Sequence, residues 1–301
     1  MKLNQKLSVV MEALFRPYRE RVPDVGHIVE QMIAKGIVSD EQKIENDHIA
    51  FRTLGVPHLG IASFEKIFLH YGYTKKEAYY FEQKKLDAYW YAPPTEAFPR
   101  IFISELRVQD LSETAQKILH RYTSNINSDP VDALDLDDAD AVGQFLHQPL
   151  WDLPTLADYQ ALAAESEYAS WVIYNRYYLN HYTISVHALP DGFSTLEEFN
   201  AFLEQIGVVL NRAGRKIKVS PDGLLRQSSS VAHEMQATFA EGQTLKIPGS
   251  YVEFAERLPL KTFEHLPKSE LKREHRREGF EAGNADKIFE STFQEQVKRQ
   301  H

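Results

Sequence analysis

The chain has 301 residues, of which 43% are hydrophobic and 26% charged, and its formal net charge is −9. This composition is typical of a globular protein, and the acidic balance argues against nucleic acid as a partner because phosphate binding needs a basic surface. The sequence has no cysteine, which excludes disulfides and cysteine nucleophiles and leaves His, Asp and Glu to bind any metal.

Residues 1–45 predict a helical lead-in. Apolar residues recur at helical spacing in 3–19 and again in 25–34. Charged residues interrupt the first 22 positions, which therefore lack the continuous apolar core of a signal peptide, and no stretch of the sequence is long enough to span a membrane. We expect a cytoplasmic protein with no membrane partner.

Two modules of strands follow, separated by a helical insertion. Residues 46–110 predict a strand at 48–53, a helix at 64–71 and strands at 78–81, 86–91 and 100–108. Residues 111–179 have the periodicity of helices. Residues 180–260 predict a strand at 181–187, a helix at 196–210 and strands at 216–219, 224–227 and 251–257. The charged tail, 261–301, predicts exposed helices packed against the body.

The two modules share one plan, a βαββ-type unit whose first strand begins with His and whose last strand carries Glu. His48 and Glu105 hold these places in the first unit, and His181 and Glu253 hold them in the second. Internal duplication is the economical explanation. We predict a single-domain α+β fold in which paired βαββ modules form an open curved sheet around a metal cavity, with added helices.

The first strand of the first module carries an unusual pair of side chains. His48, Ala50 and Arg52 share one face of this strand because side chains alternate between faces. A single His in a strand is more often structural than functional. An Arg on the same face is not a core pattern, and it favours a cavity in which His48 and Arg52 surround a small bound acid.

The first strand of the second module also has one polar face, formed by His181, Thr183, Ser185 and His187. Buried polar groups must find partners, so this face suits a cavity that holds a ligand. We interpret His187 as a residue that faces the substrate or supports the metal ligands. A partly exposed His at the end of a strand fits the pattern equally well.

Glu253 lies among aromatic and apolar residues, where an ionised carboxylate needs a cation beside it. Either a metal or a salt bridge to Arg257 on the same face meets that need. Two neutral imidazoles and one carboxylate form the facial set that binds iron(II) with open positions. The same ligand types also serve zinc hydrolases, so they do not fix the reaction.

A turn at 221–223 leads into a polar run that contains Gln227, Ser228 and Ser229. This run suggests that an amide and hydroxyl groups enter the cavity and contact the substrate. A serine-rich loop beyond a strand is the alternative.

These residues lie in stretches that resemble the 2-oxoadipate dioxygenase/decarboxylase family. The resemblance spans nearly the whole chain, and the His-plus-Arg strand and the Asn-His strand are its most specific parts. The matching stretches are Asn46–Thr53, Asn180–Thr183, Ser220–Leu225 with Gln227–Ser229, Tyr251–Ala255, Arg277–Glu281 and Asn284–Phe289. Arg226 departs from the pattern, where an apolar residue is expected, and puts the shape of the pocket in doubt.

The resemblance implies a fold similar to the vicinal oxygen chelate enzymes, including hydroxymandelate synthase. It further implies that His48, His181 and Glu253 bind iron(II) and that Arg52 grips a substrate carboxylate. The implied partners are a 2-oxo acid, with 2-oxoadipate converted to 2-hydroxyglutarate and carbon dioxide, and molecular oxygen. Lysine catabolism is the corresponding pathway.

Two alternatives remain open from the sequence. One is a zinc- or nickel-dependent lyase, isomerase or hydrolase on the same fold, in which Glu105 would be a fourth ligand. The other is a non-catalytic module that binds a small molecule. Since an oxygenase needs open metal positions, we expect Glu105 to support the metal ligands without binding the metal.

Overall fold

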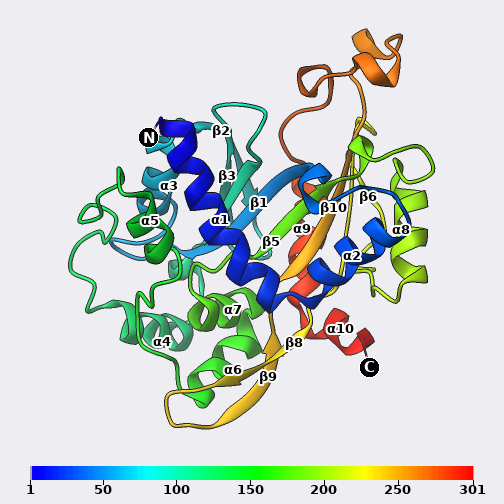
Figure 1. The fold of residues 1–301 in the computed structure, drawn as a ribbon. Helices are drawn as coiled ribbons and strands as arrows, with labels where there is room; N and C mark the ends of the chain where they lie inside the picture. The colour runs from blue at the N-terminus through cyan, green and yellow to red at the C-terminus, as the bar shows by residue number, and fades with distance from the viewer. Residues whose placement is uncertain (1, 301) are drawn as a thin grey trace.

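The computed structural model describes residues 2–300, which form an α+β fold (Figure 1). The helices are α1 (Leu3–Arg21), α2 (Pro23–Ala34), α3 (Ile61–His70), α4 (Glu113–Thr123), α5 (Ala139–Phe145), α6 (Leu156–Glu165), α7 (Glu167–Asn175), α8 (Leu196–Gln205), α9 (Ala282–Phe289) and α10 (Gln294–Val297). The strands are β1 (Asn46–Leu54), β2 (Thr74–Phe81), β3 (Leu86–Ala92), β4 (Arg100–Leu106), β5 (His181–Ser185), β6 (Lys218–Val219), β7 (Leu225–Ser229), β8 (Glu234–Thr238), β9 (Thr244–Pro248) and β10 (Tyr251–Arg257). Among residues 2–300, no helix is both long and apolar enough to cross a membrane.

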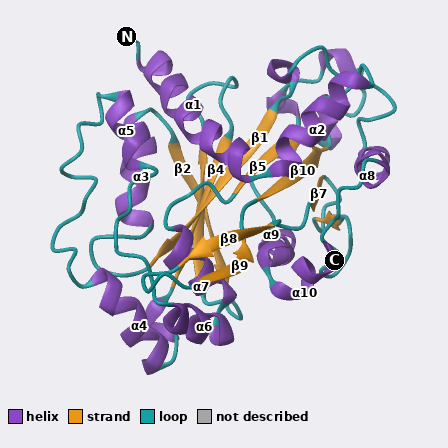
Figure 2. Cartoon of the chain, turned by 60° about the horizontal axis from the view of Figure 1, so that its bottom comes forward, coloured by secondary structure: helices purple, strands orange, loops and turns teal. Residues whose placement is uncertain are grey.

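Eight of the strands form one open, curled sheet with the order β2-β3-β4-β1-β5-β10-β7-β6. Figure 2 shows these strands at the centre of the molecule with helices around them. The first strands of the two modules, β1 and β5, are antiparallel neighbours in the middle of the sheet. Each of them pairs in parallel with the last strand of its own module, β1 with β4 and β5 with β10. The predicted paired modules and curved sheet are therefore confirmed.

Each module contributes four strands to the sheet, as many as the sequence predicted, although the βαββ label counts only three. The first module runs β1-α3-β2-β3-β4 and the second runs β5-α8-β6-β7-β10. A separate hairpin, β8 with β9, is inserted between β7 and β10. The modules are βαβββ units, and a parallel pair closes each one.

The strand register shows which positions of the two modules are equivalent. His48 pairs with Arg100 on β4, and His181 pairs with Tyr251 on β10. Two residues farther along, Phe102 is therefore the equivalent of Glu253. The predicted equivalence of Glu105 and Glu253 is wrong, because spacing along the chain does not reveal the register between strands.

Glu105 and Glu256 are the equivalent pair, and both lie at the start of a crossover helix. Glu105 Oε2 accepts a hydrogen bond of 2.7 Å from the backbone N–H of Ile61 at the start of α3. Glu256 Oε2 accepts one of 3.1 Å from the N–H of Leu196 at the start of α8. A helix N-terminus has unpaired N–H groups and a positive dipole end, so a carboxylate stabilises it. Glu105 thus lies on the outer face of the sheet, away from His48.

The outer face is the apolar face that α3 and α8 cover. Phe51 on β1 packs against Phe64 and Phe68 of α3, with ring centroids 4.9 and 5.6 Å apart. Phe254 on β10 packs in the same way against Phe199 of α8, at 5.4 Å. These side chains alternate with the polar ones on β1 and β10, which leaves the polar set on the inner face.

The C-terminal residues cover the inner face. Residues 258–281 first run out and back along one end of the sheet (orange in Figure 1), and α9 then packs across its inside. Asn284, Ser291 and Thr292 are buried there. The charged composition of the tail predicted exposed helices, but apolar and uncharged polar residues of the tail, Phe289 and Asn284 among them, are buried against the sheet.

Candidate metal centre

Three side chains from the central strands converge on the inner face. His48 comes from β1, His181 from β5 and Glu253 from β10, and their exposed fractions are 1%, 5% and 1%. His48 Nε2 lies 3.4 Å from His181 Nε2 and 3.4 Å from Glu253 Oε1, and His181 Nε2 lies 3.1 Å from Glu253 Oε2. The described residues thus contain a buried group that can hold a metal ion.

These separations fit one shared ion. Ligand atoms about 2.1 Å from a metal and at right angles to one another lie about 3.0 Å apart. The observed 3.1–3.4 Å is close to that value. The Thr183 hydroxyl also lies 3.1 Å from His48 Nε2, and a donor set of two imidazole nitrogens and one carboxylate fits a divalent cation.

The residue preceding each His fixes its ring. His48 donates through Nδ1 to Asp47 Oδ1 at 2.8 Å, and His181 donates through Nδ1 to Asn180 Oδ1 at 3.1 Å. Both Nε2 atoms are then turned toward Glu253, and they carry no hydrogen whenever the ring is neutral, because a neutral imidazole has its proton on only one nitrogen. Such supporting bonds orient metal-binding imidazoles and raise their basicity.

Asp47 reaches the inner face because β1 is irregular at this point. The register with β5 shifts between Asn46 and Ile49, and such a bulge turns side chains away from strict alternation. Asp47 accepts from Arg257 Nε at 2.7 Å, from Arg257 Nη2 at 2.9 Å and from Arg100 Nη1 at 3.3 Å. Arg257 therefore pairs with Asp47 and not with Glu253, which removes the salt-bridge interpretation of Glu253.

The charges around Glu253 explain its ionisation. Burial raises its pKa, but His48 and His181 outweigh this, and the pKa lies well below its usual range. Burial lowers the pKa of His48, yet Glu253 and Asp47 together raise it above its ordinary value. For His181, burial prevails over Glu253 and the pKa is lowered. The carboxylate is thus ionised and ready to bind a cation.

Gln227 holds the carboxylate in place. Its Nε2 donates to Glu253 Oε1 at 2.6 Å, and its Oε1 accepts from Asn284 Nδ2 at 3.0 Å. Asn284 belongs to α9, so the C-terminal cover contributes to the position of Glu253. Gln227 therefore lies at the site, as predicted, but its contact is with the carboxylate that faces the two His residues.

Arg52 lies on the inner face and has no acidic partner. Its exposed fraction is 1%, and no carboxylate among residues 2–300 forms an ion pair with it. Nη1 donates to Thr292 Oγ1 at 2.9 Å and Nη2 to the Phe289 carbonyl at 3.0 Å, while Nε has no partner. The guanidinium carbon lies 5.1 Å from the rings of both Tyr168 and Trp171. Burial lowers the pKa of Arg52.

Tyr251 presents a second unpaired donor on the inner face. It pairs with His181 in the sheet, and its buried hydroxyl makes no well-aligned hydrogen bond within residues 2–300, although Arg52 and Ser291 lie near enough to offset part of the rise that burial causes in its pKa. A buried polar group without a partner is costly and rare. Arg52 Nε and the Tyr251 hydroxyl are thus two donors near the metal ligands that a bound anion can satisfy.

The space beside the ligands is small and largely apolar. A cavity of about 20 Å³ is lined by His48, Phe102, His181, Gln227, Tyr251, Glu253, Phe280, Ala285, Ile288 and Phe289. A single water needs about 10–15 Å³ of such space. The aromatic residues and α9 therefore keep bulk water away from the metal ligands.

Of the other predicted site residues, Ser229 lies directly opposite Glu253 in the strand register, whereas Ser228 and His187 do not line the cavity beside the metal ligands. Ser228 lies on the opposite face of β7 from Gln227 and donates to Asn200 Oδ1 of α8 at 2.8 Å. Ser229 is on the inner face, where its hydroxyl bonds that of Ser291 at 2.8 Å. His187 follows β5 in a 3₁₀ turn, and its Nδ1 accepts from the Arg257 N–H at 3.2 Å.

Arg226, the residue that departs from the family pattern, does not reach the cavity. It lies on the outer face of β7, where it pairs with Glu256 at 2.9 Å and with the half-exposed Glu197. Its neighbours in the strand keep their places on the inner face. The departure therefore leaves the cavity lining unchanged.

Four contributors to the site were missed in the sequence. Asp47 and Asn180 precede the two His residues, where strict alternation places them on the other face. Tyr251 was noted only as part of a motif, and α9 was assigned to an exposed tail. The adjacency of a carboxylate or amide to each His was the available signal.

Fold and site together define a class of protein, in which two βαβββ modules share a curled sheet and hold a buried two-His, one-Glu metal group between them. The chain belongs to the 2-oxoadipate dioxygenase/decarboxylase family, whose model matches residues 10–268.

Known members of this family are similar over most of their length. The chain is 45% identical over 272 residues to the chloroplastic 2-oxoadipate dioxygenase/decarboxylase of Arabidopsis thaliana, covering 86% of this chain and 71% of the relative. It is 43% identical over 300 residues to the chloroplastic/amyloplastic enzyme of Oryza sativa subsp. japonica, covering 96% and 79%. The crystal structure of the hydroxyglutarate synthase from Oryza sativa in complex with 2-oxoadipate superposes with a TM-score of 0.89 at 42% identity, covering 99% of this chain and 95% of that one.

Proposed function

We propose that this protein is an iron(II)-dependent dioxygenase/decarboxylase that converts 2-oxoadipate and molecular oxygen to 2-hydroxyglutarate and carbon dioxide. The observation that carries the proposal is a buried His48–His181–Glu253 group beside a buried guanidinium that lacks an anion. The family and the similar structure bound to 2-oxoadipate support the substrate.

Bound iron(II) would supply the redox chemistry for oxygen and open positions where a 2-oxo acid can chelate. The protein supplies orientation. Asp47 and Asn180 hold the imidazoles in one tautomer, and Gln227 holds Glu253. Phe102 and the residues of α9 exclude water, which strengthens every charge interaction in the site.

Arg52 and Tyr251 would bind the carboxylate of the substrate that is distant from the 2-oxo group. A planar guanidinium can hold a carboxylate with two hydrogen bonds, and the phenol offers another. Both residues have an unsatisfied donor in a dry environment. A diacid exceeds about 20 Å³, so its entry requires the aromatic residues or α9 to move.

The lyase alternative, which uses a fourth ligand, is disfavoured by one observation. The position equivalent to Glu253 in the first module is Phe102, and Glu105 lies on the outer face against α3. Within residues 2–300, the first module therefore presents no carboxylate beside His48 apart from Asp47, which is paired with Arg257.

The test is oxygen uptake by iron-loaded protein with 2-oxoadipate and with 2-oxohexanoate, which has the same chain without the distant carboxylate. We expect the wild type to prefer the diacid. Arg52→Ala should retain iron and lose about 30- to several-thousand-fold in kcat/KM for the diacid, since a desolvated charge pair contributes about 2–5 kcal/mol.

Matched variants sharpen the result. Arg52→Lys keeps the positive charge but loses the planar pair of donors that binds a carboxylate with two hydrogen bonds. It should therefore recover little of the activity that Arg52→Ala loses. Tyr251→Phe should weaken the diacid preference and leave activity on 2-oxohexanoate near that of the wild type. Turnover of 2-oxoadipate without oxygen consumption would refute the oxygenase function. Equal losses on both substrates in Arg52→Ala would refute the role of Arg52.

A further inference from the structure

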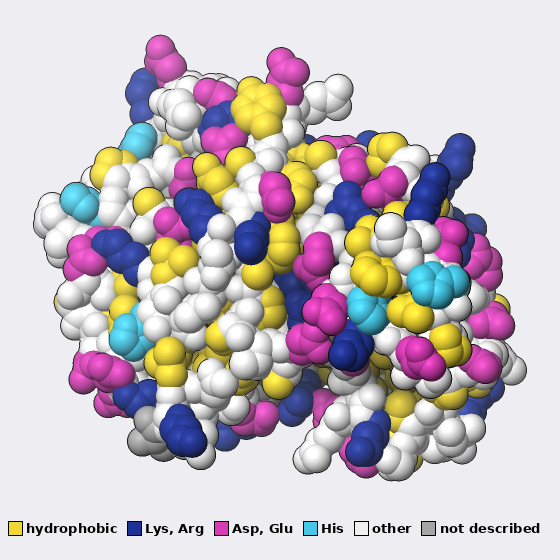
Figure 3. All heavy atoms as spheres, turned by 90° about the horizontal axis from the view of Figure 1, so that it is seen from above, with side chains coloured by type: hydrophobic (Ala, Val, Ile, Leu, Met, Phe, Trp, Pro, Cys, Tyr) yellow, Lys and Arg dark blue, Asp and Glu magenta, His cyan; other side chains and the backbone are white. Residues whose placement is uncertain are grey.

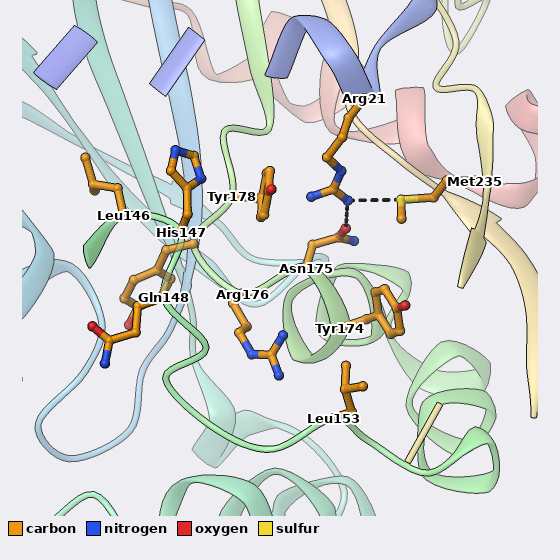
Figure 4. A pocket seen from close by; sticks show the side chains of 11 residues that line it. Arg21, Leu146, His147, Gln148, Leu153, Tyr174, Asn175, Arg176, Tyr178 and Met235 are labelled. Carbon is orange, nitrogen blue, oxygen red and sulfur yellow. Dashed lines mark hydrogen bonds between the residues drawn. The ribbon is translucent and has the colours of Figure 1, made fainter. Parts of the chain in front are cut away.

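A second cavity, of about 190 Å³, lies at the end of α7 and shares no residue with the metal centre. Figure 4 shows its walls, which come from the end of α1, the segment between α5 and α6, the end of α7 and β8. The lining residues include two arginines and no carboxylate: Arg21, Leu146, His147, Gln148, Leu153, Tyr174, Asn175, Arg176, Tyr177, Tyr178 and Met235. In a chain with a net charge of −9, this is an unusual concentration of positive charge.

Arg21 is held in place by neutral groups only. Its Nη2 donates to Asn175 Oδ1 at 2.6 Å and approaches Met235 Sδ at 3.0 Å (Figure 4). The guanidinium carbon lies 3.8 Å from the centroid of the Tyr178 ring. Nε and Nη1 make no well-aligned hydrogen bond within residues 2–300; burial lowers the pKa of Arg21, and the neighbouring Tyr178 side chain opposes this shift. A half-buried guanidinium without a carboxylate leaves its charge uncompensated.

Arg176 adopts a backbone conformation that disfavours its side chain. It follows α7 directly with φ at +58°, a region that a glycine occupies without strain and other residues rarely adopt. Such strain costs about 1–3 kcal/mol and is concentrated at functional sites. The conformation carries no function by itself, but it fixes where the Arg176 side chain leaves the backbone at the end of α7.

Hydrogen bonds to one backbone carbonyl group fix the orientation of the Arg176 guanidinium. Its Nε and Nη2 both donate to the Trp151 carbonyl, at 3.0 and 2.6 Å, and Nη1 remains without a partner among residues 2–300. Asp152 acts on it electrostatically but forms no ion pair with it. The second guanidinium thus also has an unused donor and no acid bound to it.

His147 adds a third unsatisfied group. Its Nε2 donates to the Ala13 carbonyl at 2.9 Å, so Nδ1 is the bare acceptor, and this buried atom has no partner. Burial lowers the pKa of His147, and the positive charges of Arg21 and Arg16 add to this effect, so the ring is neutral. The lowered pKa of His147 thus has burial as its first cause, and the positive charges of Arg21 and Arg16 add a smaller part.

We propose that this cavity is a binding site for a small carboxylate, separate from the metal centre. The free donors of Arg21 and Arg176 would hold the carboxylate, since guanidinium and carboxylate match in charge and geometry. Leu146, Leu153 and Tyr174 supply apolar walls for a short hydrocarbon chain (Figure 4), which a hydrated phosphate does not need. A water needs about 10–15 Å³ of such space, so 190 Å³ admits a molecule of several carbons.

The face of the molecule seen from above has a mixed charge. Figure 3 shows Lys and Arg side chains interspersed with Asp and Glu across the face seen from above, with no broad basic area. A polyanion has no extended surface to follow on this face. A small anion needs only the two arginines.

The experiment is a calorimetric titration of the Arg52→Ala protein, in which the proposed substrate site no longer competes, with glutarate, neutral glutaramide and inorganic phosphate. We expect one glutarate per chain and no binding of glutaramide. Arg21→Gln and Arg176→Gln, each added to this protein, should weaken glutarate at least tenfold. Arg215→Gln is the matched control, because this exposed arginine forms no side-chain ion pair among the described residues, and it should change nothing.

Several outcomes would overturn the proposal. They are no glutarate binding to the Arg52→Ala protein, equal binding of glutaramide, or unchanged affinity in both Arg21→Gln and Arg176→Gln. Tighter binding of phosphate than of glutarate would refute the carboxylate class. Should one arginine variant fail to fold, as judged by circular dichroism, the other decides the question alone.

Discussion

The Asp47→Asn substitution tests whether Asp47 positions the ligand His48, because it leaves the three proposed metal ligands unchanged. Asp47 accepts hydrogen bonds from His48 and Arg257 on Oδ1, and from Arg257 and Arg100 on Oδ2. An asparagine has one acceptor oxygen, so one side of its amide would turn N–H groups toward N–H groups. The substitution therefore disrupts a buried network of charged groups while the side chain at position 47 keeps nearly the same volume.

The magnitude follows from the burial of the pair. Arg257 and Asp47 are each 1% exposed, and removing one partner of a buried ion pair costs about 3–5 kcal/mol. Arg257 keeps its bonds to the carbonyls of Arg277 and Gly279, so we expect a loss near 3 kcal/mol in the free energy of unfolding. Losing the partner of a metal-binding imidazole typically lowers metal affinity about 10- to 100-fold.

The assay is an anaerobic metal titration beside urea unfolding, on wild type, Asp47→Asn and Glu278→Gln. Glu278 bonds Arg100 in the same network, but its side chain is 42% exposed and does not touch His48. We expect Glu278→Gln to leave metal affinity within twofold of the wild type. A folded Asp47→Asn protein that binds metal as tightly as the wild type would refute the role of Asp47 in positioning His48.

Three further predictions follow from the same contacts. In urea unfolding, Glu105→Ala should lower the free energy of unfolding by about 0.5–2 kcal/mol, as the loss of a helix cap does. In a metal titration its affinity should equal that of the wild type, and weaker binding would show that Glu105 supports the metal site. Burial lowers the pKa of His187 to about 3, whereas the unfolded chain takes up this proton near pH 6.5. The stability from neutral His187 is therefore complete above about pH 6.5 and is lost as the pH falls toward 3; unfolding of His187→Gln across this range should show a shallower pH dependence, and an identical one would contradict it. Phe102→Glu should gain more thermal stability from added zinc than the matched Phe102→Gln and should lose oxygen uptake, and equal gains would show that position 102 does not reach the metal.

The architecture was within reach of the sequence because it depends on local pattern. The resemblance implied His48, His181 and Glu253 as a set, whereas the residues alone left the partner of Glu253 open between a metal and Arg257. The helices between strands predicted the crossovers of the two modules. The strands, the crossover helices and the polar positions along each strand are the same whatever the register between strands. Their prediction therefore did not require knowing how the strands pair.

The errors arose where tertiary geometry decides. The register of β4 against β1 makes Phe102, not Glu105, the equivalent of Glu253. The bulge in β1 turns Asp47 inward, and alternation turns Ser228 outward. The burial of α9 was missed because the tail around it is strongly charged. The composition of a segment averages over residues that face the sheet and residues that face the solvent.

The two modules share one backbone plan but divide the chemistry between them. Each provides one imidazole from its first strand and one glutamate that caps its crossover helix. Two of their inner-face differences bear on the chemistry: the first module has Phe102 and Arg52 where the second has Glu253 and, by the same register, Ser185. A carboxylate from only one module leaves part of the metal's surroundings open, and a guanidinium from only the other places an anion site beside that opening. A substrate whose 2-oxo acid end must reach a bound metal while its distant carboxylate is held by an arginine needs this asymmetry. A fully symmetric pair of modules would instead place a carboxylate from each module beside the metal and leave no such opening.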